Sequence, residues 1–150
     1  MAGISAPAGP MHTPFPPPPP SWNLATALAW LNSKVNFERQ PNRDLAVRVL
    51  KLDRMRALAA ALGDPHLAVP AIHVAGSKGK GSITRMAASI LSAAGVRTGA
   101  FTSPHLITPN ERIAVDRLPI SDADLALAVW NVSQAEAALP ADLVEKFGQP

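Results

Sequence analysis

Residues 71–112 have the sequence AIHVAGSKGKGSITRMAASILSAAGVRTGAFTSPHLITPNER, and this stretch decides the fold. An apolar, β-prone run at 71–75 leads into a glycine-rich loop at 76–82, and the helix predicted after it ends before Gly95. A second strand is predicted at 96–102. Strand, glycine-rich loop, helix and strand in this order predict a βαβ-type unit with a parallel sheet, and therefore the α/β class.

The loop has the composition of a phosphate-binding site. Its glycines let backbone N–H groups approach a phosphate, and the following helix directs its N-terminal amides to the same point. Lys80 can carry a positive charge to phosphate oxygens, and the Ser82 hydroxyl can bind Mg²⁺. The spacing G-x-x-G-K-G-S differs from the usual G-x-x-x-x-G-K-[ST], because Val74 stands where that pattern has its first glycine. We predict that Lys80 is catalytic and that ATP contacts Gly76, Ser77, Lys78, Gly79, Lys80, Gly81 and Ser82.

A second polar cluster follows the second predicted strand. Ser103 lies there in the sequence Thr-Ser-Pro-His, and active sites of open α/β sheets lie beyond the carboxyl ends of the strands. Its hydroxyl suits a hard cation such as Mg²⁺. A Ser-Pro turn without any ligand fits the same residues equally well.

Three motifs in this order, VAGSKGKGS, GAFTSPHL and NERIAVD, resemble those of folylpolyglutamate synthase and dihydrofolate synthase, which are members of the Mur ligase family. The resemblance implies an incomplete P-loop-containing parallel-sheet fold, like the Mur ligase central domain, with a helical N-terminal segment. Residues 21–150 would be the N-terminal portion of this ATP-binding domain, with the C-terminal remainder absent. It further assigns Ser103, with Ser82, to magnesium, and His105, Asn110 and Arg112 to the substrate.

The implied activity is the ATP-dependent ligation of L-glutamate to dihydropteroate, to folate or to both, through an acyl phosphate. Such an enzyme would be a cytoplasmic monomer of folate and one-carbon metabolism that uses ATP and Mg²⁺. Residues 1–150 alone are expected to be inactive, because the resembled enzymes have further metal ligands and the glutamate site after this point. The alternative is a non-catalytic nucleotide-binding module. A cell-wall Mur ligase is disfavoured by the SPHL and NERI motifs.

Composition narrows the function classes. The 150 residues contain no cysteine, which removes disulfides, thiolate catalysis and zinc–sulfur sites. No apolar run approaches the roughly 20 residues of a membrane helix, and the N-terminus lacks a secretory signal. The net charge of +3 is carried by scattered Lys and Arg side chains, and an anionic nucleotide accounts for it without nucleic acid. We therefore expect neither nucleic acid nor a membrane among the partners.

Outside the loop, a disordered proline-rich tail is predicted at 1–20, and helices at 21–31, at 45–62 and from Ser121 to about 139. Ser21 or Asn23 can cap the first of these helices, Gly63 ends the second, and Ser121-x-x-Asp124 begins the third. Trp22 and Trp30 are expected to pack under the sheet or at its edge. By the family resemblance, the loop at 32–44 offers weak candidates for a pterin pocket, namely Phe37, Arg39 and Arg43.

Three assignments concern which side chains are buried or paired. In the helix after the glycine-rich loop, helical spacing predicts a buried stripe of Ile83, Met86, Ala87, Ile90, Leu91 and Ala94, with Arg85 pointing to solvent. In the last helix the predicted buried side comprises Leu125, Val129, Val132 and Ala135–Ala138. Glu111 and Arg112 form either a substrate clamp or an ion pair that anchors their loop.

Overall fold

The computed structural model describes residues 15–34 and 52–140. They form two compact units, one within 71–125 and the other comprising 15–34, 52–70 and 126–140. The candidates Phe37, Arg39 and Arg43 lie outside the described residues. No helix in the described ranges has both the length and the apolar character needed to cross a membrane.

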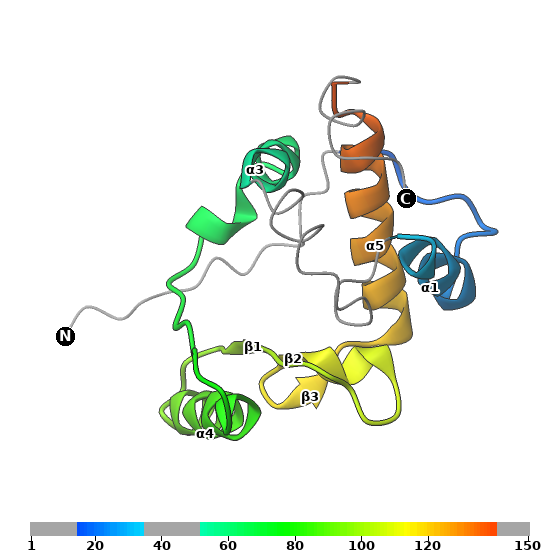
Figure 1. Ribbon diagram of the computed structural model, residues 1–150. Coiled ribbons are helices and arrows are strands. Elements are labelled where there is room, and N and C mark those ends of the chain that lie inside the picture. The colour runs from blue at the N-terminus through cyan, green and yellow to red at the C-terminus, as the bar shows by residue number, and fades with distance from the viewer. Residues whose placement is uncertain (1–14, 35–51, 141–150) are drawn as a thin grey trace. The chain divides into compact units, whose positions relative to one another are not determined.

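The first unit packs one helix against a small sheet (Figure 1). The helix is α4 (Lys80–Ala93), and the sheet contains β1 (Gly99–Phe101), β2 (Ile113–Val115) and β3 (Leu118–Pro119) in that order. Both ladders are antiparallel, with Gly99 opposite Val115 and Phe101 opposite Ile113. A short 3₁₀ helix, η2 (Pro109–Arg112), leads into β2.

Local sequence explains where these elements begin and end. Gly79 is the N-cap of α4 with φ +77°, and Gly95 with φ +80° follows its C-terminus. Asp116 and Arg117 join β2 to β3 with φ values of +48° and +72°. Two successive positive φ values are typical of the tight hairpin turn whose twist matches the flanking strands.

The α/β class is confirmed, whereas the predicted first strand is not formed. Residues 71–75 have no ladder partner in the described part of the chain, and Ile72 is 71% exposed. A strand needs a neighbour to satisfy its backbone groups, and in the described sheet β1 is an edge strand that pairs with β2 and not with this segment. The described sheet is therefore antiparallel, unlike the parallel pairing predicted from the βαβ pattern.

The buried face of α4 also differs from the prediction. Ile83, Met86 and Ile90 are 54%, 64% and 69% exposed, while Ala88 is buried. Ala94 is exposed as well, and Ala87 and Leu91 are half-buried. Helical spacing identifies an apolar stripe but not its covering partner, and the small β1–β2 sheet meets the face that contains Ala88.

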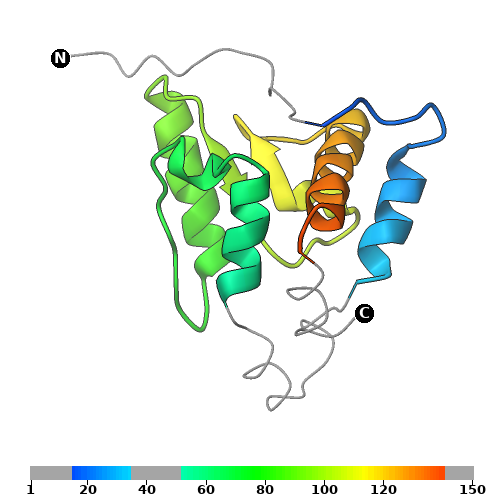
Figure 2. The same cartoon turned by 90° about the horizontal axis from the view of Figure 1, so that it is seen from above.

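The second unit contains α1 (Leu24–Asn32), α3 (Leu52–Ala61), the 3₁₀ turn η1 (Pro65–Leu67) and most of α5 (Asp122–Ala137). Figure 2 shows α1 beside α5. Trp22 meets Trp130 of α5 edge to face, with ring centroids 5.0 Å apart, and its indole N–H donates to the Ala126 carbonyl at 2.8 Å. Trp30 carries Lys34 over its ring. The partners described for Trp22 are therefore on α5 and not on the sheet as expected, because Trp130 offers an edge-to-face contact to the indole that precedes α1.

The predicted helix caps are confirmed where they are described, although α1 begins at Leu24 and not at Ser21. Asn23 caps α1 in a capping box with Thr26, and the Ser121 hydroxyl accepts from the Asp124 N–H at the start of α5. Gly63 follows α3 with φ +78°. Of the predicted buried side of α5, Leu125, Val129 and Ala135 are buried and Val132 is half-buried, but Ala137 and Ala138 are exposed.

Charged groups join the helices of the second unit. Glu136 of α5 accepts from Lys34 at 2.6 Å and from Arg54 of α3 at 2.7 Å, and its side chain is 20% exposed. The Trp130 indole N–H donates to the Pro16 carbonyl at 2.8 Å, which places the end of the proline-rich segment on this helix. Residues 1–14 of the predicted tail lie outside the described ranges.

Candidate functional site

The glycine-rich loop leads directly into α4. Gly76 has φ +151° and Gly79 has φ +77°, conformations that a side chain would strain, so both glycines are required by the shape of the loop. The first helical bond runs from the Ile83 N–H to the Gly79 carbonyl at 3.0 Å. The N–H groups of Lys80, Gly81 and Ser82 therefore precede the helical ladder, as donors at a helix N-terminus do when an anion binds there.

Lys80 lies folded against its own loop. Its Nζ donates to the Gly76 carbonyl oxygen at 2.7 Å, and the side chain is exposed. The bond ties the first residue of the helix to the start of the loop. It keeps the ammonium group beside the amides that precede the helical ladder.

Two hydroxyl groups predicted to bind metal lie in exposed segments. Ser82 is in the first turn of α4, and Ser103 is in the loop that follows β1. Hydroxyl oxygens are hard ligands, and Mg²⁺ usually keeps several waters and phosphate oxygens besides few protein groups. Within the described residues no three His, Cys, Asp or Glu side chains cluster as a metal site. The donors present thus fit a magnesium ion that is held largely by nucleotide phosphates.

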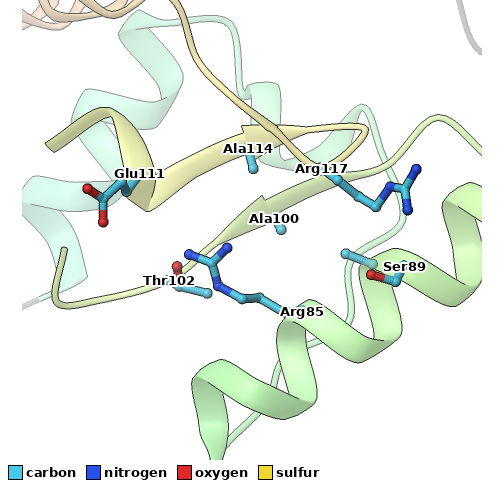
Figure 3. Close-up of a pocket in the computed structure, with 8 residues that line it drawn as sticks. Arg85, Ser89, Ala100, Thr102, Glu111, Ala114 and Arg117 are labelled. Atoms are coloured by element: carbon cyan, nitrogen blue, oxygen red, sulfur yellow. The ribbon is translucent and has the colours of Figure 1, made fainter. Parts of the chain in front are cut away.

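A cavity between α4 and the sheet shows how these two segments are related. It has a volume of about 160 Å³ and is lined by Arg85, Ala88, Ser89, Ala100, Thr102, Glu111, Ala114 and Arg117. Figure 3 shows Arg85 extending from the second turn of α4 toward Thr102, and Ser89 lying farther along the helix on the side of Arg117. The carboxyl end of β1 therefore lies beside the N-terminal half of α4. The loop before α4 and the loop containing Ser103 consequently leave the unit on the same side.

The cavity corrects the assignment of Arg85. Its side chain is exposed but lines the space between helix and sheet, so it does not point away from the sheet as predicted. The reason is the rotation of α4 that brings Ala88 to the sheet, since Arg85 and Ala88 are three residues apart and share a helix face.

Glu111 anchors the loop after β1. Its carboxylate accepts from three consecutive backbone N–H groups, those of Leu106 at 2.9 Å, Ile107 at 2.9 Å and Thr108 at 2.8 Å. The bonds from Leu106, Thr108 and Ile107 lower the pKa of Glu111 below its ordinary value of 4.5, with a smaller contribution from His105. Thr108 and Glu111 also form a capping box on η2. The anchoring role considered from the sequence is thus present, and it acts on backbone amides.

The three residues predicted to touch substrate have different surroundings. His105 and Arg112 are half-buried, and the Arg112 Nε donates to the His105 Nδ1 at 2.8 Å. Asn110 is 7% exposed, and its amide group donates to the Ile120 carbonyl at 3.0 Å and to Asp122 at 2.9 Å. Asn110 therefore ties η2 to the start of α5, and its assignment to substrate stays a prediction.

The sequence contains one signal for the anchoring role of Glu111. Thr108-x-x-Glu111 has the spacing of a capping box, which places a carboxylate beside backbone amides one turn earlier. The Glu111 carboxylate also accepts from the N–H groups of Leu106 and Ile107. These two bonds depend on the conformation of the loop, and residue spacing does not predict them.

Comparison with known proteins gives one consistent result. No family model matches the chain. It is 40% identical over 124 residues to the dihydrofolate synthase/folylpolyglutamate synthase of Bacillus subtilis, a match that covers 83% of this chain and 26% of the relative.

Solved structures agree. The folylpolyglutamate synthetase of Lactobacillus casei matches with a TM-score of 0.65 and 34% identity, over 75% of this chain and 26% of that protein. A folylpolyglutamate synthase in complex with AMPPCP and folate matches with a TM-score of 0.63 and 35% identity, over 75% and 25% of the two chains. The chain spans about a quarter of the length of the relatives it matches. By sequence and by fold, the chain is similar to about a quarter of the length of proteins of the folylpolyglutamate synthase/dihydrofolate synthase family.

Proposed function

We propose that this chain provides the nucleotide-binding loop and one metal-binding loop of an ATP-dependent ligase that joins L-glutamate to dihydropteroate, to a folate, or to both. The observation that carries the proposal is the glycine-rich loop before α4, with Lys80 beside amides that precede the helical ladder. The relative solved with AMPPCP and folate supports both an ATP analogue and a folate as ligands of this family.

The proposed chemistry needs two transfers. The substrate carboxylate attacks the γ-phosphorus of ATP, which forms an acyl phosphate and releases ADP. The glutamate amine then attacks the acyl carbon, the amide bond forms and phosphate leaves while the amine loses a proton. Such reactions depend mainly on positioning and on neutralising developing charge.

The residues of this chain have distinct roles in that scheme. The glycine loop binds the phosphate chain through its N–H groups, and Lys80 neutralises charge on the β/γ oxygens. Ser82 and Ser103 would hold Mg²⁺, which supplies charge neutralisation at the phosphates when bound. Residues 1–150 alone turn over no ATP under this proposal, because the carboxylate ligands and the glutamate site are expected elsewhere in the enzyme.

The test has two stages. Calorimetry with ATP and MgCl₂ is run on the chain and on the Lys80→Met variant, and loss of affinity in the variant supports the phosphate loop. The complete gene product is then assayed for glutamate-dependent ADP release with dihydropteroate and with tetrahydrofolate. Nucleotide binding without glutamate-dependent turnover on either substrate would overturn the ligase and favour the non-catalytic module. Absence of ATP binding would overturn both.

A further inference from the structure

The loop after β1 is held by polar contacts and gains little from packing. Leu106 is 92% exposed and Ile107 is 86% exposed, so the apolar side chains at its centre bury almost no surface. A loop without buried side chains must be ordered by hydrogen bonds if it is to keep one conformation. The contacts made by Glu111 therefore carry more of the order of this loop than a single polar side chain usually does.

The Glu111 carboxylate is a fixed internal anion for this loop. Three successive N–H groups point at its two oxygens at 2.8–2.9 Å, an arrangement that backbone nests offer to bound anions. Charge-assisted bonds of this kind are stronger than neutral ones. Residues 106–108 are thereby tied to η2, three to five residues away from the carboxylate that holds them.

Two further bonds close the segment around Ser103. The Thr102 N–H donates to the Arg112 carbonyl at 2.8 Å, which fixes the strand end immediately before Ser103. The Arg112 Nε donates to His105 Nδ1, which fixes the residue two places after it. Ser103 is thus held between a bond at Thr102 on one side and the contacts of residues 105–108 on the other.

We propose that Glu111 is a positioning residue for the metal site, acting through the loop to set the Ser103 hydroxyl and the His105 ring. This rests on the proposed function, in which Ser103 binds the magnesium of Mg-ATP. Glu111 itself touches neither nucleotide nor metal in this assignment, because its two oxygens are used by the three backbone amides. Mutation of a group that orients a metal ligand typically costs about 10–100-fold in metal affinity.

The test compares Glu111→Gln, Glu111→Asp and Asp116→Asn. Gln keeps the size of the side chain but removes the charge and turns an amide donor toward backbone donors, whereas Asp keeps the charge. Asp116→Asn is the matched control, because the Asp116 carboxylate also accepts a backbone N–H, from Thr98 at 2.9 Å, at the other end of β1. All three variants retain the fold-defining loop before α4.

The first readout is hydrogen exchange of the amides of residues 106–108, which needs no ligand. We expect Glu111→Gln to lose protection there, Glu111→Asp to regain part of it and Asp116→Asn to keep it. Unchanged exchange in Glu111→Gln would overturn the proposal, whatever the protein binds.

The second readout is the MgCl₂ concentration that gives half-maximal ATP binding. We expect Glu111→Gln to raise it about tenfold, the lower end of the range for residues that orient a metal ligand, with magnesium-free ATP affinity unchanged. An equal rise in Asp116→Asn would attribute the effect to general destabilisation and overturn the positioning role. If wild-type protein binds no ATP, the proposed function fails first. Altered exchange with unaltered magnesium dependence overturns this inference alone.

Discussion

Removal of the Lys80 ammonium tests the nucleotide loop most directly, and Lys80→Met is the substitution of choice because it keeps an unbranched side chain without charge. In the free protein the ammonium already donates to the Gly76 carbonyl at 2.7 Å. Binding of a triphosphate therefore exchanges this bond for bonds to phosphate oxygens. The measured effect is a difference between two sets of hydrogen bonds, and it is smaller than the loss of a charge that had no partner.

The magnitude follows from counting bonds. Two new charge-assisted bonds to phosphate contribute about 3 kcal/mol at the lower end of the usual range, and the bond given up to Gly76 offsets about 1.5 kcal/mol of it. The difference corresponds to a dissociation constant about tenfold higher in Lys80→Met.

Isothermal calorimetry with ATP at fixed MgCl₂ measures this change. Arg97→Met is the control, since it removes one positive charge from the same unit at an exposed position outside the loop. Wild-type affinity in Lys80→Met would refute the assignment of this lysine to the phosphates. An equal loss in Arg97→Met would show that net charge, and no local contact, controls binding.

Three further predictions concern the loop glycines, the helical unit and the response to acid. Gly76→Ala must adopt φ +151°, so it is expected to lower the free energy of unfolding by about 1–3 kcal/mol and to weaken ATP binding. Gly81→Ala lies inside α4 with open space around it and should stabilise the helix by about 0.5–1 kcal/mol. Thermal unfolding of both variants distinguishes backbone strain at Gly76 from a general sensitivity of the loop to substitution. Glu136→Gln removes a charge shared with two cations and should lower the free energy of unfolding by about 1 kcal/mol, measured in urea. Salt screens ion pairs, so the difference from wild type should shrink in high salt, and an unchanged difference would contradict the assignment. Backbone hydrogen bonds lower the pKa of Glu111, so the stabilisation of the loop by this carboxylate is complete above the ordinary value of 4.5 and is lost as the pH falls through the lowered pKa. Amide exchange at 106–108, corrected for its intrinsic pH dependence, should therefore accelerate only in that acid range. Acceleration near neutral pH would contradict the anchoring role of Glu111.

The sequence predicted best those features that are encoded within a few residues. The caps at Asn23 and Ser121 and the glycines after α3 and α4 were all identified, because each depends on backbone groups one turn away. Pairing of 71–75 and the burial of Ile83, Met86 and Ile90 were predicted wrongly. Both depend on which distant segment lies alongside, and a repeating apolar pattern does not name its partner.

The candidate site divides in the same way. Gly76 and Gly79 could be assigned from the sequence because positive φ restricts the residue type at those positions. Glu111 was ambiguous, since the Glu111–Arg112 pair fitted a substrate clamp as well as an ion pair that anchors the loop. Three amides converge on its carboxylate only because η2 turns the chain back toward residues 106–108, and no spacing rule contains that turn.

The two loops at this edge of the first unit are held by opposite means. The loop before α4 takes its shape from glycines and offers N–H groups that have not entered the helical ladder, so a nucleotide can supply their missing acceptor. The loop after β1 directs the N–H groups of residues 106–108 to Glu111, so these donors are already satisfied, while the exposed Ser103 still offers its hydroxyl oxygen. An anion should therefore bind the first loop and a cation the second. That division is what a site for Mg-ATP requires, since phosphate charge and metal charge must be met by different loops on the same side of the unit.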